Sequence, residues 1–373
     1  MADQDRPLRR GWTTGACATA ATKAAFRALV TGAFPDPVEI TLPRGQQVAF
    51  ALAMSEHEAT AAVAAVVKDA GDDPDVTHGA LVQARVRRAE AGAGVVFRAG
   101  GGVGTVTRPG LPVPPGEPAI NPVPRAMMCT AIAEVAAETG ASPDVEIEIS
   151  IPGGAAIAQR TLNPRLGIVG GLSILGTTGI VIPYSCSAWI HSIHRGIDVA
   201  RASGIDHVAG ATGSTSEAAI QRLHDLPEAA LIDMGDFVGG MLKYLRTHPV
   251  ARVSIAGGIA KLTKLGQGRL DLHSKRGLVD RDRLAELALA AGSSEALAAA
   301  VRASNTTPEA FGHAAAEGLP LGDIVARAAW ETAADALAPA PTELEIVLFD
   351  REGRLAGRAP FAPVQPSRPR NRR

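Results

Sequence analysis

The chain opens on a long run of small apolar residues with almost no polar interruption. Residues 14–31 predict a helix that Thr13 or Thr14 caps, with Gly32 just past its end. Alternating apolar and polar positions then predict strands, mixed with a second helix in no regular order. The predicted strands cover residues 37–43, 46–53, 80–88 and 144–152, and the second helix covers residues 124–140. Such a mixture is typical of an α+β domain.

Two glycine- and proline-rich segments interrupt this first part. Residues 94–107, GVVFRAGGGVGTVT, predict a hairpin whose turn is pinned by Gly100, Gly101 and Gly102. Residues 108–125 carry too many prolines for a helix or a central strand, so we expect an extended wrap over the surface.

After about residue 186 the rhythm changes, and strands alternate regularly with helices. Apolar strands at residues 207–213, 229–236 and 250–258 are separated by helical patterns, which predicts a parallel sheet in a Rossmann-like α/β domain. Ala-rich helices over residues 281–337 precede a last strand at 344–350. We therefore expect an α+β domain at 1–188, a Rossmann-like domain at 189–357 and a disordered tail at 358–373.

One stretch carries no charge between Arg165 and His191. Its length suits a membrane helix, but five glycines, a proline and paired threonines interrupt it, and a single span would cut an otherwise soluble chain in two. The favoured reading is a buried strand–loop–strand, with LGIVGG and GIVIP as strands and SILGTT as the bed of a ligand site.

Composition narrows the possible partners. The 37 basic and 38 acidic side chains nearly cancel, so no whole-molecule field recruits nucleic acid or a membrane surface. Cys17, Cys129 and Cys186 lie far apart with no CxxC, which argues against disulfides and structural zinc and fits a reducing cytosol. The charged first residues lack the apolar core of a secretory signal, so a cytoplasmic protein is expected.

The ends of the predicted parallel strands carry a candidate nucleoside-binding crevice. HVAGATGST places Gly210, Thr212 and Gly213 between a strand and a helix N-terminus, where backbone approaches a ligand closely. The next strand reaches Asp233, at the position where an acidic residue accepts hydrogen bonds from ribose hydroxyls. The third strand ends in Gly257 and Gly258. GATGST is not GxGxxG, so ordinary tight turns remain a competing reading.

Other motifs give weaker signals. GGGVGT lacks the Lys-Ser or Lys-Thr of a phosphate-binding loop. DDPDVTH, at residues 72–78, and the pair His191 and His194 have metal-ligand spacings, but a rigid turn and a helix surface explain them better. Cys186 is read as a small buried residue rather than a nucleophile. No metal site is predicted in the protein.

Cations also gather beside glycine loops and would suit a substrate with several carboxylates. They are Arg108, Arg125, Arg165, Lys261, Lys264, Arg269, His273, Lys275 and Arg276.

Several motifs together resemble the cobalt-precorrin-5B C1-methyltransferases of cobalamin biosynthesis. They are LRRGWTTGACATAATKAA, KDAGDDPDVTHG, GVGTVTRPGLPVPPGEPAINPVPR, NPRLGIVGGLSILGTTGIV and GGIAKLTKLGQG followed by HS. The resemblance covers about residues 8–350. It implies methyl transfer from S-adenosylmethionine to C1 of a tetrapyrrole that itself carries the cobalt, giving cobalt-precorrin-6A. The segment IPYSCSAWIHSIHRG departs from the expected pattern, which leaves a related precorrin open as the methyl acceptor.

With this resemblance, the crevice residues Gly210, Thr212, Gly213, Asp233, Gly257 and Gly258 are expected to hold the methyl donor. The anionic tetrapyrrole is expected to meet Thr13, Thr14, Gly15, Arg165, Thr177, Thr178, Gly179, Lys261, Lys264 and His273. No catalytic residue is predicted, because an electron-rich acceptor carbon makes a general base optional. A non-catalytic tetrapyrrole carrier and a phosphotransferase are the competing functions. The oligomeric state stays open, a homodimer included.

Overall fold

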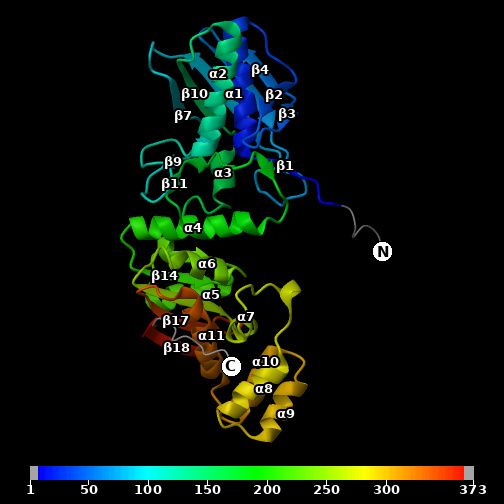
Figure 1. Cartoon of the computed structure of the whole chain (residues 1–373), viewed down its shortest axis with the longest axis vertical. Coiled ribbons are helices and arrows are strands. Elements are labelled where there is room, and N and C mark those ends of the chain that lie inside the picture. The colour runs from blue at the N-terminus through cyan, green and yellow to red at the C-terminus, as the bar shows by residue number, and fades with distance from the viewer. Residues whose placement is uncertain (1–6, 365–373) are drawn as a thin grey trace. The chain divides into compact units, whose positions relative to one another are not determined.

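A computed structural model describes residues 7–364, which form two compact units, each with its own hydrophobic core (Figure 1). The chain divides between Ser185 and Cys186, whereas the sequence pattern placed the boundary after residue 188. The expected mixture of helices and strands is confirmed.

A five-stranded sheet of order β4-β5-β6-β10-β7 organises the first unit. Its strands are β4 (Met54–His57), β5 (Ala61–Val67), β6 (Leu81–Arg88), β10 (Val145–Ser150) and β7 (Val95–Ala99). All neighbours are antiparallel except β10 and β7, which run parallel. β2 (Val38–Thr41) and β3 (Gln47–Phe50) pair antiparallel as a separate hairpin.

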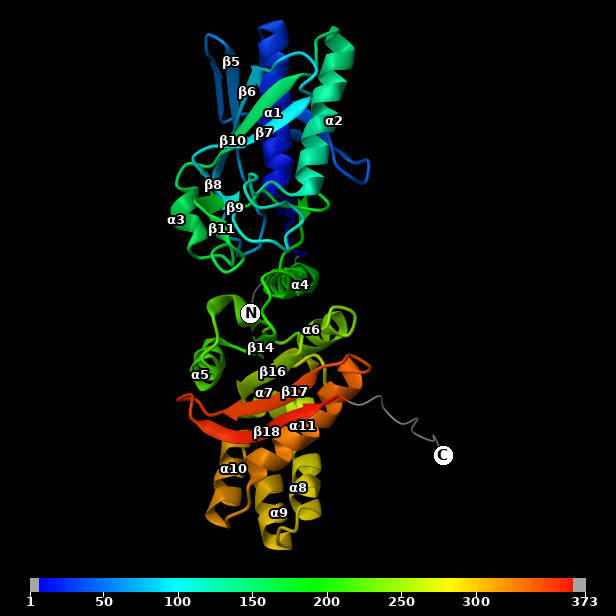
Figure 2. The same ribbon diagram turned by 90° about the vertical axis from the view of Figure 1, so that its left-hand side faces the viewer.

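The Ala-rich helix α1 (Thr14–Thr31) is the centre of this unit. Thr13 caps it, its hydroxyl accepting from the N–H of Ala16, and Gly32 ends it in the left-handed conformation, as predicted. Thirteen of its residues are buried, because α1 packs against the sheet, the β2–β3 hairpin and helix α2 (Pro122–Thr139). Small side chains allow such close packing on several sides. Figure 2 shows α1 and α2 side by side.

The predicted glycine hairpin at residues 94–107 is wrong. β7 pairs with β10, whereas β8 (Gly102–Val103) pairs with β12 (Gly171–Leu172) and β9 (Thr105–Val106) pairs with β11 (Ile168–Val169). Partners distant in the sequence therefore take the hydrogen bonds that a local hairpin would have used. Gly102 and Gly104 instead let backbones approach, since a Cβ on either would overlap a neighbouring segment. This close approach of backbones accounts for the two glycines without a phosphate-binding role.

The uncharged stretch is only partly buried, which corrects the predicted buried strand–loop–strand. Ile168, Leu172 and Ile174 enter the interior, but Val169, Leu175, Ile182 and Tyr184 expose half or more of their surface. Its strands are two residues each, β11, β12 and β13 (Ile180–Val181), and helix α3 (Gly154–Ala158) precedes them. Among residues 7–364, no helix combines the length and hydrophobicity that a bilayer crossing requires.

The second unit contains a sheet of order β15-β14-β16-β17-β18. β15 (Leu231–Asp233), β14 (His207–Ala211), β16 (Arg252–Gly258) and β17 (Glu343–Phe349) are parallel, and β18 (Leu355–Pro363) is antiparallel. Residues 358–363 therefore belong to a strand rather than to the predicted tail. The remainder of that tail, from residue 365, lies outside the described residues.

Helices cover both faces of this sheet. α5 (Ser214–His224) packs on one face, where Ala219 and Ile220 meet Ala209 and Val347. The other face meets α4 (Cys186–Ala202), α6 (Val238–Leu245), α7 (Ile259–Gly266) and α11 (Leu321–Leu337). Figure 2 shows α5 and α6 on opposite sides of the strands. The turns η1 (Glu228–Ala230) and η2 (Ser274–Arg276) and the helices α8 (Arg281–Ala290), α9 (Glu295–Ala303) and α10 (Thr307–Ala316) complete the unit.

Candidate functional site

Two threonine–glycine segments far apart in the sequence lie side by side in the first unit. β1 (Gly11–Trp12) pairs antiparallel with β13. The N–H of Thr13 donates to the carbonyl of Gly179 at 3.0 Å, and the N–H of Gly15 donates to the carbonyl of Leu175 at 3.0 Å. Residues 13–15 and 177–179, both expected at the tetrapyrrole, are thus brought together.

The polar groups of these segments differ in availability. Thr13 and Thr14 are buried, and the Thr13 hydroxyl is engaged in capping α1. The hydroxyl of Thr178 bonds within its own loop, to Ile180. Thr177 is exposed and presents its hydroxyl at the surface. The N–H groups of Thr13 and Gly15 already have partners, so they could donate to a substrate carboxylate only by exchanging those partners.

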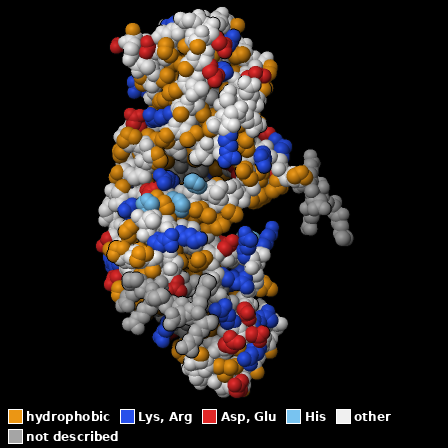
Figure 3. Space-filling view, in the orientation of Figure 1, with side chains coloured by type: hydrophobic (Ala, Val, Ile, Leu, Met, Phe, Trp, Pro, Cys, Tyr) orange, Lys and Arg blue, Asp and Glu red, His pale blue; other side chains and the backbone are white. Residues whose placement is uncertain are grey.

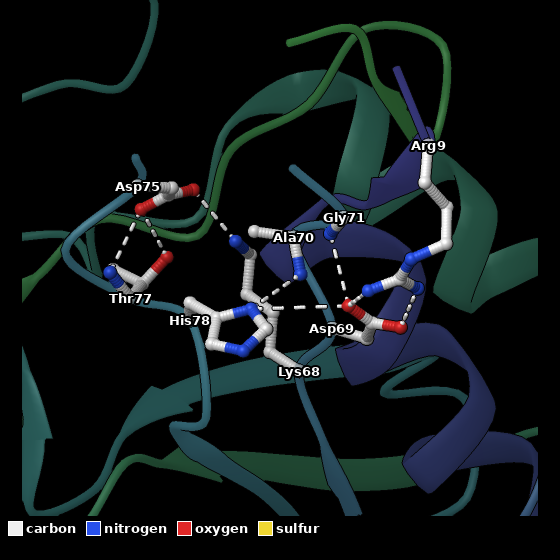
Figure 4. Close-up of polar contacts among 8 residues, drawn as sticks. All are labelled: Arg9, Lys68, Asp69, Ala70, Gly71, Asp75, Thr77 and His78. Atoms are coloured by element: carbon white, nitrogen blue, oxygen red, sulfur yellow. Dashed lines mark hydrogen bonds and ion pairs between the residues drawn. The ribbon is translucent and has the colours of Figure 1, made fainter. Parts of the chain in front are cut away.

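The loop at residues 68–79 joins the same region through Arg9 (Figure 4). The Arg9 guanidinium makes a bidentate pair with the Asp69 carboxylate, the second contact being 2.9 Å. The N–H of Gly71 also donates to Asp69, at 2.9 Å, and the N–H of Arg9 donates to Asp72 at 2.6 Å. Hydrogen bonding from Arg9, followed by that from Gly71, lowers the pKa of Asp69 to about 2.

The other side of this loop is fixed by a buried lysine. Lys68 is 1% exposed, and its Nζ lies 2.6 Å from an Asp75 carboxylate oxygen. The other oxygen of Asp75 accepts from the N–H and hydroxyl of Thr77, at 2.8 and 2.6 Å (Figure 4). Burial opposes ionisation of Asp75, but the charge and hydrogen bond of Lys68 outweigh it, so the pKa of Asp75 is lowered.

These contacts account for the carboxylates and histidine of DDPDVTH without a metal. Nδ1 of the exposed His78 accepts from the N–H of Ala70 at 3.1 Å, which uses one of its two possible ligand atoms. Across residues 7–364 no three His, Cys, Asp or Glu side chains form a group that could hold a metal ion. The motif acts here as a braced turn.

The cysteines behave differently from one another. Cys17 is fully buried on α1, and burial raises the pKa of its thiol to about 12, although the nearby Lys68 acts in the opposite direction. A thiol with so high a pKa is a poor nucleophile at neutral pH. Cys186, predicted to be buried, is exposed in the first turn of α4.

Beside Asp69 lies an open hollow of about 330 Å³. It is lined by Trp12, Ala49, Phe50, Ala51, Leu52, Ala53, Val66, Val67 and Asp69. Its walls are largely apolar, with the paired Asp69 carboxylate at one side.

In the second unit, the predicted donor residues meet at the carboxyl edge of the parallel sheet. The register sets Ala211 of β14 opposite both Asp233 of β15 and Ala256 of β16. Thr212 and Gly213 therefore follow one strand end beside Asp233 and Gly257 on the neighbouring ends. Gly210 differs, because it lies inside β14, where a Cβ would overlap methionine sulfurs of the core rather than line a crevice.

The connection that leaves β14 and the connection that crosses β14 to reach β16 lie on opposite faces of the sheet. The chain reaches β15 through α5 on one face and reaches β16 through α6 on the other. Ligands in open α/β sheets bind at such a switch point, outside the carboxyl ends of the strands. Thr212 and Gly257 mark this point, where a Cβ on Gly257 would lie 2.8 Å from the Thr212 hydroxyl.

Lys261 spans the switch point. From the first turn of α7 its Nζ donates to the carbonyl of Thr212 at 2.7 Å and lies 3.1 Å from the carboxylate of Asp236. Lys261 was expected at the tetrapyrrole, and its position places it instead among the predicted donor residues.

The other predicted cations mostly brace loops. Lys264 is buried, and its Nζ donates to the carbonyl of Leu272 at 3.0 Å. His273 is exposed and caps η2, its Nδ1 accepting from the N–H of Lys275. Arg108 donates to the carbonyl of Arg165 at 3.2 Å in the first unit. The remaining contacts of this kind are Arg125 with Ile120, Glu117 and Pro118, and Arg269 with Arg276.

Sequence reasoning missed a buried polar network on the α5 face of the second sheet. Glu345 is fully buried on β17 and accepts from Arg358 Nε at 2.6 Å and from the Ser254 hydroxyl at 2.8 Å. His224 Nε2 lies 2.6 Å from the same carboxylate, and His207 Nε2 lies 2.9 Å from the Ser254 hydroxyl. The one available signal was a glutamate within the apolar strand LEIVLF. Glu345 lies at the fourth position of this parallel sheet, away from the switch point.

Comparison with known proteins shows which families and relatives this chain resembles, independently of the geometry of the site. A family model described as "CbiD" matches residues 1–183, and one described as "CbiD, C-terminal domain" matches residues 271–360. A protein of Bradyrhizobium sp. named cobalt-precorrin-5B C(1)-methyltransferase is 62% identical, covering 99% of this chain and 98% of its own. A protein of the same name from Agrobacterium fabrum is 61% identical over the whole of both chains. The crystal structure of a cobalamin biosynthesis protein from Archaeoglobus fulgidus is 27% identical with a TM-score of 0.40, covering 74% of this chain and 86% of that one.

Proposed function

The chain belongs to the CbiD family, and from that premise we propose that it methylates C1 of cobalt-precorrin-5B to give cobalt-precorrin-6A. The methyl donor is S-adenosylmethionine, and the cobalt belongs to the substrate. The observation that carries the proposal within the structure is the meeting of Thr212, Asp233 and Gly257 at one switch point.

The second unit, in this proposal, acts as a Rossmann-like donor-binding domain. The Asp233 carboxylate accepts hydrogen bonds from the ribose hydroxyls, and the Thr212–Gly213 turn at the start of α5 approaches the adenosyl group. Lys261 and Asp236 carry opposite charges beside that turn. They match the carboxylate and ammonium of the donor's amino acid end, so we reassign Lys261 from the tetrapyrrole to the donor.

The first unit, in this proposal, contacts the tetrapyrrole. Three motif segments, residues 9–15, 68–79 and 175–184, converge there. The exposed Leu175, Ile182 and Tyr184 offer apolar surface to a macrocycle, and Thr177 between them offers a hydroxyl to its carboxylates.

The reaction forms a bond between the acceptor carbon and the methyl carbon while the sulfur–methyl bond breaks. The conjugated tetrapyrrole supplies the electron pair, and the sulfonium leaves as a neutral thioether. The protein's task is to align the two centres and exclude water, which can contribute about 7–11 kcal/mol. No side chain in residues 7–364 is assigned as a general base.

Calorimetric titration with S-adenosylhomocysteine tests the donor site. Asp233→Ala should weaken binding by about 1–3 kcal/mol, the cost of lost hydrogen bonds in a closed site. The matched control is Asp206→Ala, because the largely exposed Asp206 lies just before β14, at the opposite edge of the same sheet. Equal losses in both variants would remove the crevice assignment.

An assay with cobalt-precorrin-5B under anaerobic conditions tests the reaction itself. A tetrapyrrole carrier would bind the macrocycle without binding S-adenosylhomocysteine, in the presence or absence of tetrapyrrole. Methyl transfer from labelled S-adenosylmethionine to the tetrapyrrole separates the enzyme from that carrier.

A further inference from the structure

The first turn of α4 covers the turn that follows β15. The indole N–H of Trp189 donates to the main-chain carbonyl of Asp233 at 3.1 Å. The same indole lies close to Gly235, where an added Cβ would be 3.4 Å from Cζ2 and 3.5 Å from Cε2 and Nε1. Gly235 has a positive φ of 52°, so this turn has a conformation that most side chains would disfavour. Trp189 is therefore bonded to Asp233 at one end of this turn and lies close to Gly235 at the other.

Much of this indole has no protein covering it. Trp189 is 46% exposed, and its ring lies 6.5 Å from that of Phe237 at a tilted angle. Tryptophan is a large apolar side chain that usually stabilises a protein by being buried, and its N–H usually finds a partner. Here the N–H is satisfied and the ring is left open beside a strand end of the candidate crevice.

The helix that carries Trp189 is firmly held in the second unit. Ile193 and Ile197 enter the core, and Ile190 packs on Gly240, where a Cβ would lie 3.1 Å away. The His194 ring stacks on Tyr244 of α6 with centroids 3.9 Å apart. Figure 3 shows histidine side chains gathered at the level of α4. An exposed ring on an anchored helix is preorganised for a flat ligand, because little side-chain freedom remains to be lost.

We propose that Trp189 is an aromatic wall of the donor crevice, stacking on the adenine ring, and that its N–H holds the turn carrying Asp233. The ligand's identity rests on the proposed function, whereas the wall itself rests on the bond from Trp189 to Asp233 and on the closeness of the indole to Gly235. Every base has a π-face, and an aromatic side chain stacks on it without reading its hydrogen-bonding edge. Asp233 and Trp189 thereby divide the recognition of adenosine between the sugar and the base. This gives a role to the segment IPYSCSAWIHSIHRG, which departs from the pattern expected of the family.

Two variants separate the stacking from the hydrogen bond. Trp189→Leu removes the aromatic face and should weaken S-adenosylhomocysteine binding about 5- to 150-fold, the range of base–aromatic stacking. Trp189→Phe keeps a ring but loses the N–H, and it should lie between wild type and Trp189→Leu. A purely structural tryptophan would instead lower the melting temperature in both variants and leave the affinity of the folded fraction unchanged.

Intrinsic fluorescence supplies a readout that a structural role does not move. The chain has three tryptophans, Trp12, Trp189 and Trp330, and Trp12 belongs to the first unit. S-adenosylhomocysteine should quench wild type and Trp12→Phe equally, and Trp189→Phe should lose that quenching. Quenching that persists in Trp189→Phe, or affinity that is unchanged in Trp189→Leu, would overturn the aromatic wall while leaving the donor site in place. Failure of wild type to bind the ligand even with tetrapyrrole present would overturn the proposed function and the wall together.

Discussion

The main-chain N–H of Thr13 donates to the carbonyl oxygen of Gly179, joining the start of α1 to the end of the second threonine–glycine segment. Gly176 lies in that segment against the Thr13 side chain. The N-terminal cap of α1 therefore packs against this loop. A substitution in the loop can test that packing while the helix sequence stays unchanged.

Gly176→Ala should destabilise the first unit by at least about 2 kcal/mol. Gly176 has a φ of 135°, and an added Cβ would overlap the Thr13 side chain, so backbone strain and overpacking both contribute. Urea unfolding followed by circular dichroism measures the change. The control is Gly170→Ala, at a φ of 90° with no atom within 4 Å of its Cβ, which should cost only the about 1–2 kcal/mol of left-handed strain. Equal costs would show that packing against Thr13 contributes nothing.

The Arg9–Asp69 pair should stabilise the protein at neutral pH and be lost in acid. The folded-state pKa of Asp69 is lowered to about 2 by Arg9, from about 3.9 in an unfolded chain. Its contribution is therefore complete above pH 3.9 and disappears as the pH falls towards 2. Both side chains are substantially exposed, at 57% and 42%, so solvent screening keeps the contribution of this pair to the free energy of unfolding small.

Acid unfolding of wild type, Arg9→Lys and Asp69→Asn measures this contribution. Arg9→Lys keeps the charge but loses the bidentate geometry, so its midpoint of acid unfolding should lie between those of wild type and Asp69→Asn. If Asp69→Asn shows the same pH midpoint as wild type, the pair makes no measurable contribution.

Lys261 and Lys264 lie three residues apart on α7, yet substitution of Lys261 should mainly affect ligand binding and substitution of Lys264 should mainly affect stability. Lys261→Met should weaken S-adenosylhomocysteine binding about tenfold, because it removes the cation beside Thr212 and Asp236. Lys261 is the more exposed of the two, so its loss should lower the melting temperature less than the loss of Lys264. Lys264→Met should lower the melting temperature, because its buried ammonium donates to the carbonyl of Leu272. Calorimetry and thermal melting on both variants separate the roles. A melting loss confined to Lys261→Met would reverse the assignment.

The buried network around Glu345 should make the second unit sensitive to acid. Burial, followed by the charge of His224, lowers the pKa of His207 to about 4, whereas an unfolded histidine titrates near 6.5. The unfolded chain therefore binds the proton first, so stability is full above pH 6.5 and falls by about 1–3 kcal/mol as the pH drops towards 4.

His207→Gln should flatten this pH dependence while keeping a hydrogen bond to Ser254. The free energy of unfolding, measured at intervals between pH 7 and pH 4, gives the slope for each protein. An unchanged slope in the variant would assign the acid sensitivity to other groups. Glu345→Leu, which leaves Arg358 and His224 without their carboxylate, should cost about 3–5 kcal/mol at neutral pH.

Features that depend on residues close together in the sequence could be predicted. The Thr13 cap and Gly32 end of α1 follow from side-chain chemistry within one turn of helix, and the structure has both. The alternating rhythm of the second half predicted the strands that end at Ala211, Asp233 and Gly258, although it carried the first two on to residues 213 and 236. Because parallel strands end at one edge, those residues could be placed together before the structure was known.

Features that depend on distant partners could not be predicted. β7 and β8 were expected to pair with each other, but each has a partner more than forty positions further along the chain, and no local pattern encodes that competition. Glu345 gave no sign that its carboxylate meets Arg358, Ser254 and His224 inside the sheet. Trp189 was noted only as a departure from a pattern, since its position close to Gly235 requires the turn after β15 to be known.

The antiparallel pairing of β1 with β13 has a consequence for synthesis. Gly11 is among the first described residues to leave the ribosome, and its partner Val181 is near the end of the first unit. The α1 N-terminus must therefore wait for almost the whole unit before its last hydrogen bonds can form. The second unit begins at Cys186, so the first can close as an independent cotranslational folding unit while the parallel sheet is still being translated.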